Sequence, residues 1–383
     1  MYKYTIMVEY TCDICSKVFT IRGRYTSHKN RKRPCKAVDD AVVAPKKAAD
    51  AFSEEDAPVS EKAVKQNKNA VKHEDAIIKP FLKWVGGKTQ ILTEVLSLFP
   101  KEINNYYEPF LGGGSVLLGL LSIVKEGRIA VKGKIHASDL NENLIAVYKN
   151  IQTKPREVIK EVHTLVEQFS KCKEGDAAKV NRKAVTLKEA LTAPESYYFW
   201  IRSRFNSLKG VDRLTCAASA MFLFMNKTCF RGLYREGPNG FNVPYGNYKM
   251  PTIIEPTHIM EVSELIKDVE FNVSSFRESL AGDFTKDDFI YLDPPYAPEN
   301  DKSFVSYTSD GFALEDHTAL FERCKEIIKD GAQFVMSNAD VDLVKNAFPV
   351  PTYKTNIISC RRAINSKKPG AKTNEVLISF CGG

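Results

Sequence analysis

The fold is decided by residues 288–296, which read DFIYLDPPY. Residues 288–292 form an apolar run that is typical of a buried strand. Two consecutive prolines end this strand, because proline has no N–H to donate to a neighbouring strand. In α/β proteins the carboxyl ends of the strands form the edge of the sheet at which ligands bind. We therefore predict that the residues directly after the strand line a ligand site.

The residues after the strand, Asp293, Pro294, Pro295 and Tyr296, suit methyl transfer onto an exocyclic amine. The lone pair of such an amine is conjugated with its ring, so the amine is a poor nucleophile. The carboxylate of Asp293 and the carbonyl of Pro294 can accept its two N–H bonds and favour pyramidal geometry, while Tyr296 can stack on the base. A strand that simply ends in a proline-rich turn is the alternative, and these four residues alone leave it open.

The chain has 383 residues, a formal net charge of +8 and 43% hydrophobic residues. This length fits one large domain with an accessory module, and the positive charge favours a polyanionic partner. No signal peptide is expected, and no apolar run is long enough to span a bilayer. The nine scattered cysteines indicate a reducing compartment. The expected location is the cytoplasm or the nucleus, including a viral replication site.

Residues 1–36 contain Cys12, Cys15, His28 and Cys35, a spacing that resembles zinc fingers with two cysteines and two histidines. The last position departs from that pattern, since it is a cysteine reached after a longer gap. Four such ligands suit tetrahedral Zn²⁺, whose binding would fold so small a segment. A chance cluster is the alternative. We expect a hairpin and a helix around the metal, with a basic face that binds phosphates or acts as a nuclear-import signal.

The rest of the chain divides by composition. Residues 37–76 are rich in Ala, Lys, Glu and Asp without a sustained hydrophobic period, which predicts a flexible linker. Residues 77–383 alternate strands with helical stretches, which predicts an α/β fold with a parallel sheet. Two helices parted near Pro155 are expected over 141–170, and an inserted target-recognition region over 195–260. The expected strands lie near 105–109, 134–138, 270–274, 288–293, 332–337, 353–359 and 375–381.

Two glycine-containing segments precede the DPPY motif in the chain. Residues 81–88, FLKWVGGK, place Trp84 and Lys88 beside paired glycines that let a ligand approach the backbone. Residues 107–117, YEPFLGGGSVL, combine a strand, a glycine loop and a helix start, which leaves room for a nucleoside-like ligand. No Gly-Lys-Ser/Thr follows, so a nucleotide-hydrolysing phosphate loop is disfavoured. Each segment alone could equally be an ordinary glycine turn before a helix.

Acidic residues follow two further strand candidates. Asp139 ends the short strand near 134–138 and suits hydrogen bonding to ribose hydroxyls. An Asp that caps the following helix is the alternative at this position. Asp283 and Phe284 follow another strand candidate, and we expect them to grip the edge of an adenine ring.

The ordered set of motifs resembles the Dam-like family of DNA adenine-N6 methyltransferases. The likeness covers 79–383 and leaves the N-terminal finger and linker outside. The matching segments, in chain order, are 81–88, 108–115, Asp139, 241–246, 293–298, 303–307, 337–340 and 361–365 together with the final strand.

The resemblance implies a Rossmann-like sheet that binds S-adenosylmethionine and methylates a flipped-out adenine. Flipping is required because a stacked and paired amine cannot meet the sulfonium methyl group in line. Catalysis then rests on orientation and electrostatics, without a covalent intermediate. Asp293 to Tyr296 are expected to hold the adenine. The residues expected to bind the cofactor are Trp84, Lys88, Glu108, Phe110, Gly112, Gly114, Asp139, Asp283, Phe284 and Asp293.

Target recognition is expected in the stretch 226–249, where residues 237–240, GPNG, look like a hairpin turn that could enter the major groove. Family members that read GATC carry a basic residue in this hairpin, and its absence here puts that specificity in doubt. A basic loop near 361–368 is expected to add backbone contacts, although a solvated loop is an equal alternative. The residues expected to contact DNA are Arg231, Arg235, Asn239, Lys249, Arg361 and Arg362.

Other functions fit less well. Cytosine-N4 methylation uses the same amine chemistry, but Asp rather than Ser at position 293 favours adenine by family resemblance. RNA or a protein glutamine is disfavoured by the basic recognition segment. A zinc-finger DNA-binding protein with an inactive methylase domain is a different class, and the intact Asp139, Asp293 and glycine loops disfavour it. The expected partners are double-stranded DNA and a restriction nuclease, with the chain acting as a monomer or weak dimer.

Overall fold

The computed structural model describes residues 10–12, 18–19, 28–29, 77–249, 251–297, 312–361 and 372–380. The chain divides into two compact units, Met1–Asn69 and Ala70–Gly383. The predicted linker, 37–76, lies outside the described residues. None of the described helices is both long and apolar enough to cross a bilayer.

In the first unit a short hairpin is described. Strand β1 (Tyr10–Thr11) pairs antiparallel with β2 (Val18–Phe19), and Tyr10 lies opposite Phe19. Cys12 follows β1 and is buried, while His28 and Lys29 are helical. These fragments agree with the hairpin and helix expected for residues 1–36. Cys15 and Cys35 lie outside the described residues.

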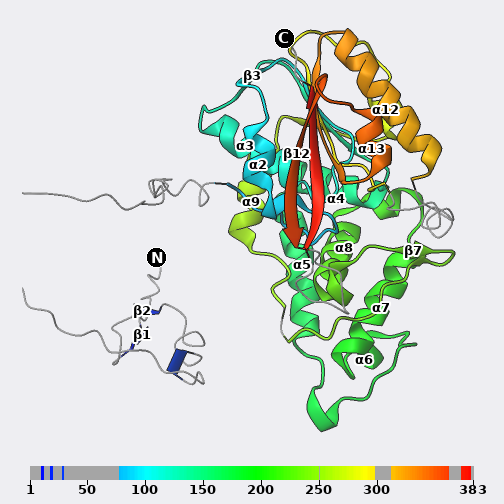
Figure 1. The fold of residues 1–383 in the computed structure, drawn as a ribbon. Helices are drawn as coiled ribbons and strands as arrows, with labels where there is room; N and C mark the ends of the chain where they lie inside the picture. Colours follow the sequence, from blue (N-terminus) through cyan, green and yellow to red (C-terminus); the bar gives the residue numbers. More distant parts are fainter. Residues whose placement is uncertain are drawn as a thin grey trace, which may run out of the picture. The chain divides into compact units, whose positions relative to one another are not determined.

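The second unit is built on a sheet of seven described strands in the order β12-β13-β11-β10-β4-β6-β9 (Figure 1). Strands β11, β10, β4, β6 and β9 run parallel, and β13 pairs antiparallel with both β11 and β12. All seven strands expected from the sequence are therefore confirmed. Their bounds are β4 Tyr106–Glu108, β6 Ile135–Asp139, β9 Val269–Val273, β10 Phe289–Leu292, β11 Gln333–Ala339, β12 Tyr353–Arg361 and β13 Lys372–Phe380.

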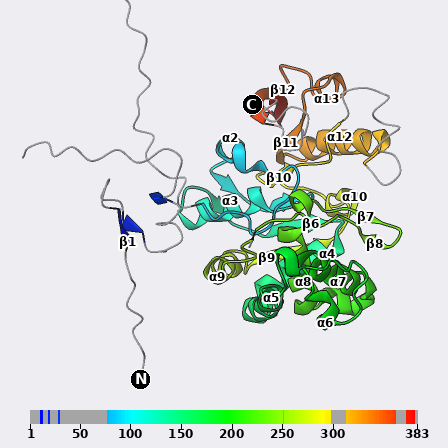
Figure 2. The same cartoon turned by 90° about the horizontal axis from the view of Figure 1, so that it is seen from below.

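Helices cover both faces of this sheet, as parallel strands require. Side chains alternate along β10, so Phe289 and Tyr291 join one core cluster while Ile290 and Leu292 join the other. Figures 1 and 2 show α2 and α3 on one side of the sheet and α12 and α13 on the other. The bounds are α2 Leu92–Ser97, α3 Ser115–Lys125, α9 Pro256–Leu265, α10 Phe276–Ser279, α12 Leu314–Lys329 and α13 Asp342–Ala347. Two short strands, β3 Glu102–Ile103 and β5 Ala130–Val131, pair separately.

A helical insertion lies between β6 and β9. It contains α4 (Glu142–Thr153) and α5 (Pro155–Phe169), which are parted where Pro155 takes the first helical position, as expected from the sequence. α6 (Leu187–Ala190), α7 (Pro194–Ser207) and α8 (Cys216–Thr228) follow, and Figure 1 shows them below the sheet in green. The chain then forms the hairpin of β7 (Glu236–Gly237) and β8 (Gly240–Phe241), which confirms the predicted turn at 237–240.

Candidate active site

The order of the strands reverses between β4 and β10, and this reversal fixes where a ligand can bind. From β4 the chain moves outward to β6 and β9, and then returns to place β10 on the other side of β4. The two strands pair in parallel, with Phe289 opposite Tyr106. In open α/β sheets ligands bind at this switch point, beyond the carboxyl ends of the strands. The loop after Glu108 and the motif that begins at Asp293 therefore meet at one edge.

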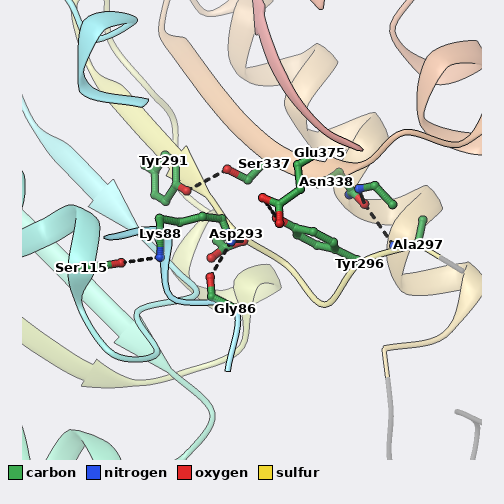
Figure 3. Close-up of polar contacts among 11 residues, drawn as sticks. Gly86, Lys88, Ser115, Tyr291, Asp293, Tyr296, Ala297, Ser337, Asn338 and Glu375 are labelled. Carbon is green, nitrogen blue, oxygen red and sulfur yellow. Dashed lines mark hydrogen bonds and ion pairs between the residues drawn. The ribbon is translucent and has the colours of Figure 1, made fainter. Parts of the chain in front are cut away.

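A buried ion pair occupies the end of β10. The Nζ atom of Lys88 lies 2.7 Å from Oδ1 of Asp293, and the two side chains are 3% and 21% exposed. Lys88 begins the short helix η2 (Lys88–Gln90), and its backbone N–H donates to Oγ of Ser115 at 3.0 Å. Its ammonium also donates to the carbonyl of Gly86 at 2.7 Å (Figure 3). The sequence predicted Lys88 as a cofactor contact, and the structure places its amine on Asp293.

Burial and the ammonium of Lys88 act on Asp293 in opposite directions. Burial raises the pKa of the Asp293 carboxyl, and the charge and hydrogen bond of Lys88 lower it. Glu375 of β13 raises the pKa further, because it is a second carboxyl group near the first. Burial is the largest of these effects, so the pKa of Asp293 lies above its ordinary value, and Lys88 limits that rise.

Glu108 closes β4 and is a second buried carboxyl group near Asp293. Its side chain is 2% exposed, and Oε2 accepts a hydrogen bond of 2.6 Å from the hydroxyl of Tyr106. Burial raises the pKa of Glu108 to about 8, and the nearby charge of Asp293 adds to the rise. Glu108 therefore holds its proton at neutral pH until a cation approaches it.

The glycine loop after β4 is shaped by Trp84 and Asp139. A Cβ atom on Gly112 would lie 2.9 Å from Cδ1 of Trp84, and one on Gly113 would lie 2.8 Å from its Cβ. The indole itself stacks on Tyr234, with ring centroids 5.6 Å apart. These two glycines therefore make room for the side chain of Trp84, whereas the sequence had suggested room for a nucleoside-like ligand.

Asp139 braces the same loop from the end of β6. Its Oδ2 accepts from the N–H of Gly112 at 2.9 Å, and its Oδ1 accepts from the N–H of Asn141 at 2.9 Å. The residue that caps α4 is Asn141, whose side chain accepts from the N–H of Leu144 at 3.0 Å. The helix-capping alternative for Asp139 is therefore wrong. Burial raises the pKa of Asp139, and the two N–H donors lower it.

An aromatic cluster lies beside this loop. The ring of Phe110 stacks on Phe276 at 5.9 Å and meets Phe312 edge-on at 5.8 Å. Phe276 begins α10, just after β9, whose Val273 pairs with Asp139. Phe276 was not predicted from the sequence, where its one signal was an aromatic residue two positions after the strand predicted at 270–274.

Asp283 and Phe284 do not join this group. The helix α10 returns the chain to the amino edge of the sheet, where the carbonyl of Asp287 accepts from Asn104, ahead of β4. Asp283 is exposed there, and Phe284 is buried against Tyr107. The predicted contact of Asp283 and Phe284 with an adenine ring therefore receives no support from their position.

The residues predicted to contact DNA lie in and around the insertion. Arg231 is exposed in the turn η5 (Phe230–Gly232) with φ of +58°, and Asn239 and Lys249 are also exposed. Nε of Arg235 donates to Oδ1 of Asn242 at 2.6 Å, across the hairpin. Arg361 ends β12, and Arg362 lies outside the described residues.

Two of the four predicted zinc ligands, Cys12 and His28, fall within the described residues. Among the described residues no group of three or more His, Cys, Asp or Glu side chains is placed to hold a metal ion. Since Cys15 and Cys35 are outside that set, the predicted ligand group is incomplete there. The zinc site accordingly stays a prediction.

Comparisons with known proteins extend over most of the second unit. A family described as D12 class N6 adenine-specific DNA methyltransferase matches residues 84–362. The Type II methyltransferase M.MjaIII of Methanocaldococcus jannaschii is 35% identical over 298 residues, which cover 76% of this chain and 94% of that protein. The Type II methyltransferase M1.LlaDCHI of Lactococcus lactis is 29% identical over 320 residues, covering 80% and 96%. A DNA adenine methylase of Vibrio cholerae is 30% identical over 306 residues, covering 79% and 96%.

Proposed function

Because the chain belongs to the D12 class of N6 adenine-specific DNA methyltransferases, we propose that residues 293–296 hold a flipped-out adenine of duplex DNA for methylation. The reaction is transfer of a methyl group from S-adenosylmethionine to the exocyclic N6 amine. The observation that carries the assignment of the site is the buried pair of Lys88 and Asp293 at the switch point of the sheet. The pair places the carboxyl group of Asp293 as a hydrogen-bond acceptor where the N6 amine must be held.

The two hydrogen atoms of the amine need two acceptors. The carboxylate of Asp293 and the carbonyl of Pro294 follow β10 directly, so the amine can donate to both at once. Donating both hydrogens pulls the nitrogen toward pyramidal geometry and frees its lone pair for attack. The ring of Tyr296 offers a stacking surface for the base. These residues act by orientation and electrostatics alone.

The residues around the glycine loop fit S-adenosylmethionine, which supplies a methyl group on a positively charged sulfur. Glu108 is a buried carboxyl group that a cationic ammonium would ionise, and Asp139 lies at the end of the neighbouring strand, where ribose hydroxyls bind in such sheets. We therefore assign the methionine portion to Glu108, Gly112 and Gly114, and the ribose to Asp139. Phe110 flanks the same loop from the aromatic cluster.

The hairpin of β7 and β8 and the turn η5 are the proposed contacts with DNA. Arg231 and Arg235 lie in these segments, Asn239 is at the hairpin tip, and Lys249 follows them. A hairpin can enter the major groove, where side chains distinguish the bases. Arg361 and Arg362 would add phosphate contacts, which set position without reading sequence.

We further propose that Cys12, Cys15, His28 and Cys35 bind one Zn²⁺. The described hairpin and the buried Cys12 support this finger. Metal analysis of the purified chain should give one zinc per chain, and Cys35→Ser should lower that ratio. An equal zinc content in both proteins would contradict the assignment.

The Type II names of two relatives lead us to propose a partner restriction nuclease, in whose presence methylated host DNA should resist cleavage.

The experiment that tests the reaction is nucleoside mass spectrometry. Unmethylated duplex DNA is incubated with the protein and S-adenosylmethionine, and is then digested to nucleosides. N6-methyladenine is expected, and Asp293→Asn, which keeps the shape of the side chain, should abolish it. N4-methylcytosine instead would overturn the choice of base. Full activity of Asp293→Asn would overturn the role given to residues 293–296.

A further inference from the structure

Tyr296 is tied to a residue far along the chain. Its hydroxyl donates a hydrogen bond of 2.8 Å to Oε2 of Glu375 (Figure 3). Glu375 lies on β13 and pairs with Ala339 on β11, so the bond joins the proposed base-stacking ring to the far half of the sheet. Neither the motif at 293–296 nor the sequence around Glu375 indicated this contact.

Two more contacts restrain the same ring. Nζ of Lys88 lies 5.0 Å from the centroid of the Tyr296 ring, which is a cation–π distance. The next residue, Ala297, donates its backbone N–H to Oδ1 of Asn338 at 3.0 Å, and Asn338 is fully buried on β11. Tyr296 is therefore fixed at its ring face, at its hydroxyl and through the backbone that follows.

A carboxylate suits this place better than a neutral acceptor. Glu375 is followed on β13 by the buried residues Val376, Leu377 and Ile378, so an acidic side chain next to them is unusual for packing alone. A hydroxyl–carboxylate bond is stronger than a bond between neutral groups. Glu375 and burial also raise the pKa of Tyr296, so the hydroxyl remains a donor.

We propose that Glu375 is a positioning residue, which orients the ring of Tyr296 for the flipped adenine by holding its hydroxyl. This inference rests on the proposed stacking role of Tyr296. Without the bond the ring can turn about its side-chain torsions, and the base loses a fixed surface. The amine would then meet Asp293 and the methyl group in fewer of the bound orientations. The rate of methyl transfer should fall while the affinity for S-adenosylmethionine stays the same.

The test compares four variants: Glu375→Ala, Glu375→Gln, Tyr296→Phe and Tyr296→Ala. Single-turnover methylation rates are measured, together with the fluorescence of 2-aminopurine at the target position, which reports on the environment of the flipped base. Glu375→Ala and Tyr296→Phe should each slow methylation about tenfold or more, as expected for a lost hydrogen bond to a charged group. Glu375→Gln keeps an oxygen acceptor and should restore most of the rate.

A cycle of mutations separates positioning from general stabilisation. The double variant Glu375→Ala/Tyr296→Phe should be no slower than either single variant, because both remove one bond. Asn374→Ala is the matched control, since Asn374 is exposed on the same strand and its amide donates to Asp340 at 3.3 Å. This control should keep the rate and the fluorescence of the unaltered protein.

The outcomes distinguish the two proposals. If Tyr296→Ala methylates normally, the stacking role itself is wrong. If Tyr296→Ala is impaired while Tyr296→Phe and Glu375→Ala both act normally, only the role of Glu375 is overturned. Multiplying losses in the double variant would also overturn it. Should Glu375→Ala fail to fold, Tyr296→Phe decides, because it removes the same bond and leaves β13 intact.

Discussion

Replacing Lys88 with methionine tests how the site keeps Asp293 ionised. Methionine has nearly the length of lysine but no charge, so it removes the 2.7 Å ion pair and preserves much of the packing. The charge and hydrogen bond of Lys88 lower the pKa of Asp293, and the variant must therefore raise it. Because the ionised carboxylate is the proposed acceptor for the amine, the acidic limb of the activity profile should move to higher pH.

The size of the shift follows from the geometry of the pair. At the 2.7 Å of this pair and an effective dielectric constant of about 20, two unit charges attract by about 6 kcal/mol. That attraction is the upper limit of what Lys88 contributes to stabilising the ionised carboxylate. Asp293 is 21% exposed, so water partly replaces the lost ammonium. The pKa of Asp293 should therefore rise, by less than this upper limit implies.

The assay is kcat/KM for DNA between about pH 5 and pH 9, which reports ionisations of the free enzyme. Lys345→Met is the matched control, because Lys345 also pairs with an aspartate, Asp340, at 3.0 Å but is 47% exposed. It should leave the acidic limb in place and change the free energy of unfolding little, because solvent screens an exposed ion pair. An unmoved limb in a folded, active Lys88→Met protein would refute the dependence of Asp293 on Lys88.

The same variant carries a stability signature. Removing one partner of a buried ion pair leaves an uncompensated charge and typically costs about 3–5 kcal/mol. Lys88→Met should approach the lower end of that range, since Asp293 is partly exposed. Lys88→Met/Asp293→Asn should be more stable than Lys88→Met, because the unpaired carboxylate is gone. Urea denaturation measures both differences.

Three other changes probe the cofactor loop and the hairpin. The pKa of Glu108 is raised to about 8 from about 4.5. Its contribution to the free energy of unfolding is therefore full below about pH 4.5 and is lost as the pH rises to about 8. Glu108→Gln should flatten this decline, as measured by urea denaturation. Gly114→Ala should cost about 1–3 kcal/mol in stability and weaken cofactor binding in calorimetry, because φ is +66° and the new methyl group meets the Tyr148 hydroxyl. Gly127→Ala, with φ of +71° and nothing within 4 Å, should show the backbone cost alone. Arg235→Ala should weaken binding to the cognate site by about 1–3 kcal/mol relative to other DNA, measured by titration.

The strands were predictable because their sequences carry local signals. The run that ends at Asp293 is apolar throughout, which is typical of a strand buried on both faces. Pro155 marked the junction of two helices for an equally local reason, since it fits the first position of a helix and not the interior. The residues 293–296 alone suggested methyl transfer onto an amine, and family resemblance then supplied the cofactor and the DNA adenine substrate.

Contacts between distant segments were not predictable in the same way. Lys88 was expected at the cofactor, and its ion pair with Asp293 depends on a distant contact, in which its backbone N–H donates to Ser115 at the start of α3. The position of Asp283 and Phe284 was not predictable, because α10 has only four residues, too few to show a helical period, and the chain from α10 to Asp287 runs back to the amino edge of the sheet. Only the register of β13 against β11 shows that Glu375 faces Tyr296.

The charges at this edge explain why a cationic cofactor suits the site. The buried ammonium of Lys88 pairs with Asp293, whose charge in turn raises the pKa of Glu108, while Glu375 raises the pKa of Asp293. Burial and the charge of Asp293 raise the pKa of Glu108 to about 8, so Glu108 is protonated at neutral pH in the absence of a further positive charge. S-adenosylmethionine carries positive charge on its sulfur and on its ammonium. In the proposed complex its binding and the ionisation of Glu108 favour each other by linkage, so the affinity for the cofactor should increase as the pH approaches about 8.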